Sequence, residues 1–475
     1  MQFPTQTSLL VALHISLAVW GVYHVLLYKR DPRGAVGWII AIVIIPYGGP
    51  IAYSLFGINR VKLRARGLKK QLFAVDYEIG VRTEAMQIDE SEGLRTIGHR
   101  VTGRAVTTGN RVEPLINGDV AYPHMLASIA QARERILLAT YILKSDSAGM
   151  QFADALQQAQ QRGVDVKVLV DGFGENYSWP PMSRVLRKLG IKVARFLPPR
   201  LLPPSIYFNL RNHRKLLVVD GRIAYAGGMN ISSDHTGSSD RPLRVTDVHF
   251  ALHGPVTGEL AQMFYHDWQF TTAETRLPEK PAANTVDEQS PEQDMLCRLV
   301  PDSPGEELDA LVLTIAGVIS AARESIDIMT PYFLPMRELI AALQSAALRG
   351  VRVRVVLPQK NNLFFVHWAN RNMLADLLHW NIEVFYQPAP FCHTKLLCID
   401  NDYTLIGSAN LDPRSLRLNF ELGIEVFSGE LNAKMRAHID AAVSVSRELT
   451  AKELAERSIP VRLRDSAFAL LSPYL

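Results

Sequence analysis

Two long apolar stretches near the N-terminus are the first pattern along the chain. Residues 9–28 are mostly apolar, with two histidines as polar members, and residues 35–55 carry no charge. Each stretch is long enough, as a helix, to cross a hydrocarbon core of about 30 Å. Only residues 29–34 separate them, so we predict two transmembrane helices that form a tight hairpin over residues 1–58.

Two alternatives apply to this N-terminal region. A cleaved signal peptide would begin with basic residues, whereas residues 1–8 carry no charge and a second apolar stretch follows. We therefore expect a retained membrane segment. The second stretch is interrupted by Pro46, Gly48, Gly49 and Pro50. It either crosses the membrane with a kink or enters it without crossing fully.

After residue 112, short apolar strands alternate with amphipathic helices, and the same order of elements occurs twice. In the first half the predicted segments are residues 125–132, 135–141, 155–159, 162–170, 184–189 and 191–193. In the second half they are residues 318–322, 326–329, 342–346, 349–357, 373–380 and 382–385. Alternating strands and helices predict an α/β fold with helices on both faces of the sheet. The internal repeat predicts two pseudo-symmetric lobes.

The repeat and the changes in composition together predict five parts. They are the membrane hairpin (1–58), a basic juxtamembrane segment and connector (59–111), the first lobe (112–271), a polar interlobe linker (272–295), and the second lobe with a C-terminal helix and tail (296–475). The C-terminal helix is expected over residues 431–456.

Charge and cysteine content narrow the class of protein. The formal net charge is +4 at pH 7, far from the basic excess of a dedicated nucleic-acid binder, so we expect no nucleic acid partner. Cys297, Cys392 and Cys398 show no metal-ligand spacing and suit a reducing compartment. We expect neither a metal nor another cofactor.

Basic residues beside the apolar stretches predict the orientation in the membrane. The loop between the stretches has three of them, and six follow the second stretch: Arg60, Lys62, Arg64, Arg66, Lys69 and Lys70. Because basic residues concentrate on the cytoplasmic side, we expect a multi-pass protein whose body is cytoplasmic. The basic loop opposes this orientation. The six residues could also hold anionic lipid headgroups.

The candidate chemistry lies in two copies of one motif, His-x-Lys-x4-Asp. The first copy is His213, Lys215 and Asp220, and the second is His393, Lys395 and Asp400. Each copy leads into a small-residue loop that ends in an asparagine: Asn230 in the first half, and Asn410, preceded by Ser408, in the second. Two copies with identical spacing are very improbable by chance.

Each copy predicts a β-hairpin with its histidine and lysine side by side. Apolar residues follow each lysine, and the turn signals are Asp220-Gly221 and Asn401-Asp402. Side chains alternate along a strand, so the histidine and lysine of each copy share one face. The lysines, Asn230, Asn410 and Ser408 are expected to hold phosphate oxygens, and histidine can act as nucleophile or acid. Two such sets suit phosphodiester exchange without a metal.

A carboxylate on the second ring nitrogen would orient each catalytic histidine. Asp220 and Asp400 belong to the motif and count among the catalytic candidates, although their place at turns also suits holding the hairpins. Asp247, 34 residues after His213, and Glu421, 28 residues after His393, are the stronger candidates for orienting the two rings.

The paired motifs resemble those of the phospholipase D superfamily, and the flanking residues resemble bacterial cardiolipin synthases. The resemblance covers nearly the whole chain. It is carried by residues 410–421 (Asn-Leu-Asp-Pro-Arg-Ser-Leu-Arg-Leu-Asn-Phe-Glu), by residues 220–228, and by the N-terminal region with Trp38, Pro46 and residues 53–57. One departure is Met229, where a smaller or polar residue is more usual, which leaves one fewer donor at that loop.

The resemblance implies one active site at the pseudo-twofold interface of two lobes, in a bacterial inner-membrane protein. The implied reaction is phosphatidyl transfer between two phosphatidylglycerol molecules, which gives cardiolipin and glycerol through a phosphohistidine, with His213 favoured as the nucleophile. Other phospholipids could serve as acceptors. The alternatives are a membrane-bound phospholipase D, a nuclease of the same superfamily and a non-catalytic scaffold. The oligomeric state is not predicted.

Overall fold

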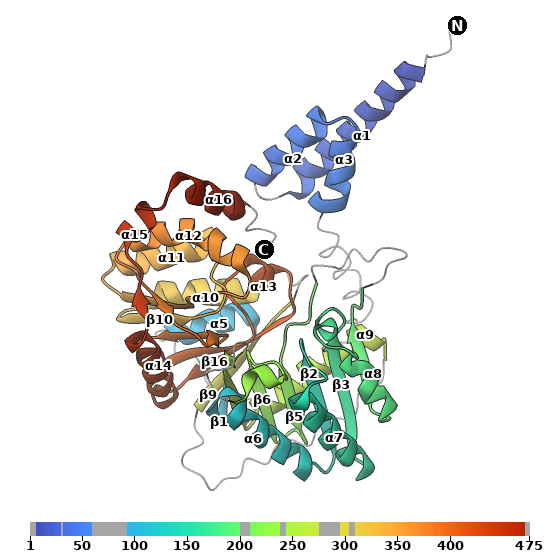
Figure 1. The fold of residues 1–475 in the computed structure, drawn as a ribbon, viewed down its shortest axis with the longest axis vertical. Coiled ribbons are helices and arrows are strands. Elements are labelled where there is room, and N and C mark those ends of the chain that lie inside the picture. The colour runs from blue at the N-terminus through green and yellow to red at the C-terminus, as the bar shows by residue number, and fades with distance from the viewer. Residues whose placement is uncertain are drawn as a thin grey trace. The chain divides into compact units, whose positions relative to one another are not determined.

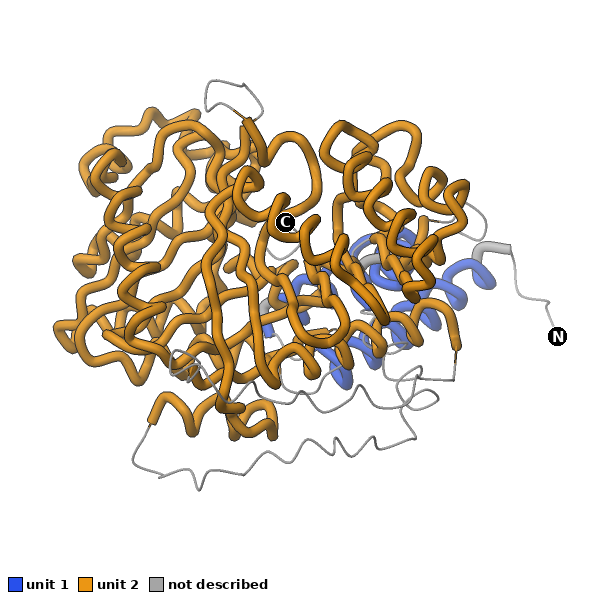
Figure 2. The backbone as a smooth tube through the Cα atoms, turned by 90° about the horizontal axis from the view of Figure 1, so that it is seen from below, with its two compact units in different colours: residues 1–67 blue, residues 68–475 orange. Residues whose placement is uncertain are grey.

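The computed structural model describes residues 6–29, 32–58, 93–199, 210–237, 244–274, 295–303 and 309–470. The chain forms two compact units, residues 1–67 and 68–475 (Figure 2), and each is described by itself. The basic cluster at residues 60–70, most of the predicted interlobe linker and the last five residues lie outside the described residues.

The N-terminal unit is a long helix with a shorter helical segment folded against it. Helix α1 (Gln6–Tyr28) is followed by α2 (Pro32–Ile44), α3 (Gly48–Ala52) and the π-helical turn η1 (Tyr53–Gly57). Within the described residues, only the helix at Ser8–Tyr28 is long and apolar enough to cross a membrane, by length and composition. Helix α2 has 13 residues, or about 20 Å.

The second apolar stretch turns back within the length of α1. Tyr47 lies at the turn with a positive φ of 56°, and its hydroxyl donates to the carbonyl of Leu10 (2.6 Å). The chain then returns, because Tyr53 reaches His24 (2.8 Å) and Lys29 donates to the carbonyl of Gly57 (3.3 Å). Of the two alternatives for this stretch, the fold-back agrees with entry without full crossing, because the end of the stretch returns to the start of the loop before it. The physical cause is the interruption at residues 46–50, where proline removes a helix donor.

The second unit is built on one continuous sheet (Figure 1). Fifteen of the described strands form it, in the order β17-β12-β11-β10-β14-β15-β16-β9-β1-β8-β6-β5-β2-β3-β4. The order on the two sides of the β9–β1 junction is the same when read outward, apart from the additional strand β17. The predicted α/β fold and the two pseudo-symmetric lobes are confirmed.

The elements of each lobe follow the predicted order. The first lobe contains β1 (Thr107–Ile116), α6 (Asn117–Gln131), β2 (Arg135–Thr140), α7 (Ser147–Gln161), β3 (Asp165–Asp171), η2 (Gly174–Tyr177), α8 (Met182–Lys188), β4 (Lys192–Phe196), β5 (Leu216–Val219), β6 (Ile223–Gly227), η3 (Ser233–His235), β7 (Val245–Thr246), β8 (Val248–His253) and α9 (Val256–Thr272). The second contains β9 (Met295–Asp302), α10 (Ala310–Ala321), β10 (Ser325–Met329), α11 (Arg337–Leu348), β11 (Arg352–Pro358), α12 (Phe364–Leu378), β12 (Glu383–Gln387), β13 (Phe391–Cys392), β14 (Leu396–Ile399), β15 (Tyr403–Gly407), α13 (Pro413–Arg417), β16 (Glu421–Phe427) and α14 (Gly429–Ser444).

Helices cover both faces of the sheet in each lobe. In the first lobe, α6, α7 and α8 bury one apolar cluster against β2, β3 and β5, while α9 packs on β2, β4 and β5 from the other side. In the second lobe, α10, α11 and α12 bury the corresponding cluster, and α14 lies across the opposite face. Each lobe therefore has a hydrophobic core of its own. Burial of apolar surface stabilises each core by about 25 cal/mol per Å².

Three segments differ from the sequence-based expectations. The connector contains a helix, α5 (Gly93–Thr102), which packs on α10 of the second lobe. The expected C-terminal helix ends at Ser444 and is followed by strand β17 (Arg447–Glu448), α15 (Ala451–Ala455) and α16 (Ile459–Leu470). Strand β17 pairs with the edge strand β12, so sheet pairing overrides the helical propensity at this point.

The two motif hairpins, β5–β6 and β14–β15, have aspartates at equivalent positions in their turns. Asp220 and Asp400 have positive φ angles of 53° and 50°. The Asp220 carboxylate accepts from the backbone N–H groups of residues 133, 134 and 135 at 2.8–2.9 Å. The Asp400 carboxylate accepts from those of residues 323, 324 and 325 at 2.8–3.2 Å. Each aspartate therefore joins its hairpin to the start of a neighbouring strand.

We expect Asp220→Ala and Asp400→Ala each to lower the free energy of unfolding by about 2 kcal/mol, because three backbone donors lose a charged acceptor. Turnover per folded molecule should stay close to that of the unchanged protein. Thermal unfolding and initial rates measure the two effects, and Asp154→Ala, at an exposed position on α7, is the matched control. If the Asp220→Ala protein folds well but has no turnover, the structural role is wrong and Asp220 takes part in catalysis.

Candidate active site

The two histidines lie where the lobes meet, at the start of the two motif hairpins. The backbone N–H of His213 donates to the carbonyl of Phe420 (3.0 Å), and that of His393 donates to the carbonyl of Thr246 (2.8 Å). Strand β13, just before His393, pairs in parallel with β7 of the first lobe. Each motif is thus hydrogen bonded to the other lobe before its own hairpin begins.

The histidine–carboxylate pairs are exchanged between the lobes. His213 Nδ1 lies 3.0 Å from Glu421 Oε1 and 3.1 Å from Oε2, and His393 Nδ1 lies 2.9 Å from Asp247 Oδ2. Both carboxylates are fully buried, and the two histidine side chains are about one-tenth exposed. The sequence order associated each carboxylate with the histidine of its own half, and the structure corrects that assignment. Each histidine thus has Nδ1 directed at a carboxylate of the other lobe.

The surroundings of the two carboxylates differ. Glu421 accepts from the hydroxyl of Ser408 (2.5 Å) and from the side-chain amide of Asn419 (3.1 Å). Burial raises the pKa of Glu421, but His213, Lys215 and Ser408 outweigh it, so the net shift is downward. Ser408, expected to bind phosphate, therefore holds Glu421 in place.

Among the described residues, no hydroxyl donates to Asp247 as Ser408 does to Glu421. The residue equivalent to Ser408 is Gly228, and a Cβ atom there would lie 2.9 Å from Asp247 Oδ2. Asp247 accepts from its neighbour's backbone N–H (Val248, 2.8 Å). Burial raises the pKa of Asp247, and the nearby Lys395, His235 and His249 only partly offset this. The two halves of the site are therefore chemically unequal.

Both motif lysines are buried beside their histidines. Lys215 Nζ donates to the carbonyl of His213 (2.5 Å), and Lys395 Nζ donates to that of His393 (2.6 Å). Lys395 Nζ also lies 3.1 Å and 3.2 Å from the two ring nitrogens of His393. Burial lowers the pKa of Lys215 to about 7 and that of Lys395 to about 8, although the buried carboxylates act in the opposite direction.

The pKa values of both motif histidines are lowered when no anion is bound. Burial lowers the pKa of His213 to about 4, with Glu421 acting against this and Lys215 adding to it. Burial, Lys395 and Lys215 lower the pKa of His393 well below its usual value. A positive charge on His213 lowers the pKa of His393 further, so the two rings titrate as a coupled pair. An anionic substrate would raise both values.

The two asparagines lie in equivalent loops after β6 and β15. Asn230 Oδ1 accepts from the backbone N–H of Ile142 (3.2 Å), and Asn410 Nδ2 donates to the hydroxyl of Ser415 (3.2 Å). Asn410 Oδ1 is buried and has no hydrogen-bond partner among the described residues. Asp220 and Asp400 lie at the far ends of β5 and β14 from the histidines, bound to backbone as described above.

Several residues around the site were not anticipated. Tyr141 and Tyr332 lie edge-on to His213 and His393, with ring centroids at 5.2 Å and 6.4 Å. They follow β2 and β10 at positions offset by one residue, because Ile142 corresponds to Tyr332 and Pro331 to Tyr141, so comparing the two repeats would not have found them. Arg214, inside the first motif, is buried and bonds to Asp267 (2.5 Å) and to two backbone carbonyls of the second lobe. No group of three His, Cys, Asp or Glu side chains in the described parts of the chain could hold a metal ion.

Comparison with known proteins shows which class of protein has this fold and these paired motifs. The family model described as "Cardiolipin synthase, PLD-like domain" matches residues 125–268 and 315–443, and one described as "Phospholipase_D-nuclease N-terminal" matches residues 16–57. The fold is similar to that of phosphatidylserine synthase from Haemophilus influenzae, with a TM-score of 0.61 and 16% identity over 77% of this chain and 95% of that one. Fold and site together define a two-lobed phospholipase D-type body.

Relatives narrow this class further. The chain is 30% identical to "Major cardiolipin synthase ClsA" of Bacillus subtilis over 98% of each chain. It is also 30% identical to "Cardiolipin synthase A" of Pseudomonas syringae, over 97% of this chain and 96% of that one. The chain belongs to the bacterial cardiolipin synthase family of the phospholipase D superfamily. It is accordingly a phosphatidyltransferase, and its N-terminal apolar helix indicates membrane association.

The exchange of carboxylates predicts specific energetic couplings. In double-mutant cycles of unfolding free energy, His213→Ala with Glu421→Gln, and His393→Ala with Asp247→Asn, should each show a coupling of about 1–3 kcal/mol, as directly bonded pairs do. The same-lobe combinations, His213→Ala with Asp247→Asn and His393→Ala with Glu421→Gln, are the matched controls and should show less. Stronger coupling within a lobe than between lobes would contradict the pairing.

The lowered lysine pKa values predict the alkaline behaviour of the enzyme. Free enzyme should lose the positive charges on Lys215 and Lys395 as the pH rises through about 7 and about 8, so kcat/KM should fall there. A bound phosphate raises the pKa of both lysines, so kcat, which reports on the enzyme–substrate complex, should fall only at higher pH. Initial rates between about pH 6 and about pH 10, on either side of these values and up to the usual lysine range, test this. A kcat/KM that stays level to the top of this range would contradict it.

Proposed function

We propose that the protein is a cardiolipin synthase that transfers a phosphatidyl group from one phosphatidylglycerol molecule to another through a phosphohistidine. The observation that carries this proposal is the pair of buried histidines, each with Nδ1 on a carboxylate and a lysine beside it. Two imidazoles, each with a carboxylate on Nδ1, can divide attack and proton transfer at their Nε2 atoms between them. The names of the relatives support the choice of product.

In the first half of the reaction, Nε2 of His213 attacks the phosphorus of phosphatidylglycerol. A P–N bond forms and the bond from phosphorus to the glycerol headgroup oxygen breaks. Protonated His393 gives its proton to that oxygen, and glycerol leaves. Neither histidine is readily protonated in the free site. The negative charge of the bound phosphate favours protonation of His393, because a bound anion raises the pKa of a neighbouring imidazole. Lys215 and Lys395 neutralise the non-bridging phosphate oxygens.

In the second half, the now neutral His393 accepts the proton of a headgroup hydroxyl on a second phosphatidylglycerol. The oxygen attacks phosphorus, the P–N bond breaks, and His213 is restored. Two phosphatidylglycerol molecules thus give one cardiolipin and one glycerol. The surroundings of Glu421 suit His213 as the nucleophile. Hydrogen bonds from Ser408 and Asn419 favour the ionised form of Glu421, which stabilises the ring that carries the phosphoryl group.

Purified protein incubated with phosphatidylglycerol as the only phospholipid should yield cardiolipin and glycerol in equal amounts, measured by mass spectrometry. His213→Ala and His393→Ala should abolish product, because each removes one of the two proton-handling groups, and His379→Ala, at an exposed histidine, should not. Activity should survive exhaustive chelation, because lysines supply the positive charge. Phosphatidate in place of cardiolipin would favour the alternative, a phospholipase D that uses water.

We also propose that the chain crosses the membrane once and that its body is cytoplasmic. The fold-back of residues 32–57 supports this, because Gly57 returns to Lys29. Both basic segments, the three residues of the loop and the six that follow the second stretch, then lie on one side. Such a concentration of positive charge favours the cytoplasm. Without the fold-back, the two basic segments would lie on opposite sides.

Single cysteines can test this topology, because all three natural cysteines are buried. Arg33→Cys, in the loop, and Lys452→Cys, whose lysine is 82% exposed, should both resist a membrane-impermeant maleimide in intact cells. Both should react once the membrane is permeabilised. If only one of the two reacts in intact cells, the stretch crosses fully. If both react there, the body is outside the cytoplasm.

A further inference from the structure

A second cationic site lies at the far edge of the second lobe. A cavity of about 330 Å³ is lined by residues of α12, β12, β17 and α15, by the loop after β11 and by the segment between α15 and α16. Three strands, β10, β11 and β12, lie between β14 and this edge of the sheet, a separation of about 14 Å from the motif strand. The cavity is therefore distinct from the catalytic histidines.

The lining of the cavity is strongly positive. It includes Lys360, Arg371, Arg447 and Arg457, against one carboxylate, Glu453. Arg447 is paired with Glu453, whereas Lys360 is exposed. Guanidinium and ammonium groups that converge on one space are the groups with which proteins recognise phosphate.

Two of these arginines, Arg371 and Arg457, are bound by a buried carboxylate outside the cavity. Arg457 donates to Asp465 (2.6 Å), and Arg371 lies 3.5 Å from the same carboxylate. Asp465 is fully buried and also pairs with Arg464, so one carboxylate is shared by three guanidinium groups. The two arginines are thereby positioned without being neutralised.

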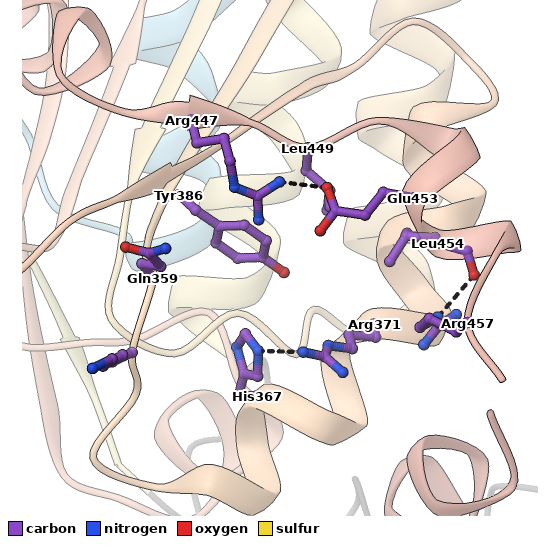
Figure 3. Close-up of a pocket in the computed structure, with 10 residues that line it drawn as sticks. Gln359, His367, Arg371, Tyr386, Arg447, Leu449, Glu453, Leu454 and Arg457 are labelled. Atoms are coloured by element: carbon purple, nitrogen blue, oxygen red, sulfur yellow. Dashed lines mark hydrogen bonds and ion pairs between the residues drawn. The ribbon is translucent and has the colours of Figure 1, made fainter. Parts of the chain in front are cut away.

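A buried hydroxyl points into the same space. Tyr386 is 4% exposed, and its hydroxyl has no hydrogen-bond partner among the described residues. Figure 3 shows its ring between Arg447 on one side and His367 and Arg371 on the other, with the hydroxyl directed into the cavity. Burying a hydroxyl without a partner is costly, and a phosphate oxygen in the cavity would accept its hydrogen bond.

The fold builds this site from the C-terminal elements of the second lobe. Tyr386 and Arg447 are directly opposite each other in the β12–β17 pair, and the Arg447 guanidinium lies over the Tyr386 ring at 5.5 Å. His367 and Arg371, four residues apart, share one face of α12 and bond to each other at 3.0 Å. Helix α16 then packs along α12, and its Asp465 holds Arg457 and Arg371 in the cavity wall.

We propose that this cavity binds the phosphate group of an anionic phospholipid, as a site separate from the catalytic pair. The volume is at the lower end of the range for ligand pockets, which suits a phosphorylated glycerol headgroup with its acyl chains outside. A soluble glycerophosphate offers the same chemistry. A lipid is favoured because Ile459 and Leu463, close after Arg457, are 71% and 65% exposed on one face of α16, an apolar surface beside a phosphate site.

A cysteine in the cavity wall gives a local measure of binding. Gln359 lines the cavity and is exposed, and the natural cysteines are buried, so Gln359→Cys provides one reactive thiol. Glycerol 1-phosphate added to the full-length protein in neutral detergent should slow its reaction with N-ethylmaleimide. Lys452→Cys, which does not line the cavity, is the matched control and should react at an unchanged rate.

Two further substitutions test which groups hold the phosphate. Adding Tyr386→Phe to Gln359→Cys should raise the half-protecting concentration about 10-fold, the value of one hydrogen bond to a charged group. It should not destabilise the empty protein, because the removed hydroxyl has no partner there. Lys360→Gln should raise the concentration several-fold, and Lys434→Gln, on α14, should leave it unchanged. An unchanged half-protecting concentration with both Tyr386→Phe and Lys360→Gln would overturn the site.

Nanodiscs distinguish the source of the phosphate. Nanodiscs that contain phosphatidylglycerol should protect Gln359→Cys, and nanodiscs of phosphatidylcholine with oleate, which are anionic without an anionic phosphate, should not. Protection by glycerol 1-phosphate alone would overturn a lipid ligand, and equal protection by oleate would overturn phosphate recognition. None of these measurements depends on transfer activity, so their failure leaves the proposed synthase function unaffected.

Discussion

The exchange of histidine–carboxylate pairs between the two lobes is the constraint on which the active site depends. His213 is oriented by Glu421 and His393 by Asp247, so neither lobe holds a complete pair by itself. A buried carboxylate without its partner is strongly unfavourable. The packing of the lobes and the formation of the site are therefore a single event, reinforced by Arg214, which spans the same interface.

Two copies of one motif do not make two equal half-sites. Glu421 is held by a hydroxyl and an amide and is stabilised as an anion, whereas a glycine backbone packs against Asp247, whose pKa is raised by burial. A reaction that needs one neutral and one protonated imidazole benefits from this difference, because identical surroundings would give both rings the same proton affinity. Part of the difference comes from the position at which Ser408 in one half corresponds to Gly228 in the other.

Departures from the internal repeat also occur away from the active site. The first lobe's sheet ends at β4, while the second lobe adds β17 beyond the equivalent strand and continues into α15 and α16. These additions create the cationic cavity around Tyr386 and leave apolar residues of α16 exposed. In the N-terminal unit, the turn at Tyr47 brings Gly57 back to Lys29. For an enzyme whose substrates are lipids, both features concern how the chain meets a membrane.

The sequence by itself determined the α/β class, the repeat, the two motif hairpins and the residue types of the site, because these follow from local periodicity, turn residues and spacing. It could not reveal that Asp247 and Glu421 exchange partners, that Ser408 binds a carboxylate, or that Asp220 and Asp400 bind backbone N–H groups. Nor could it show that the second apolar stretch folds back, since hydropathy measures length and not direction. These features arise from contacts between residues far apart in the chain, and only the packing of the lobes and helices decides them.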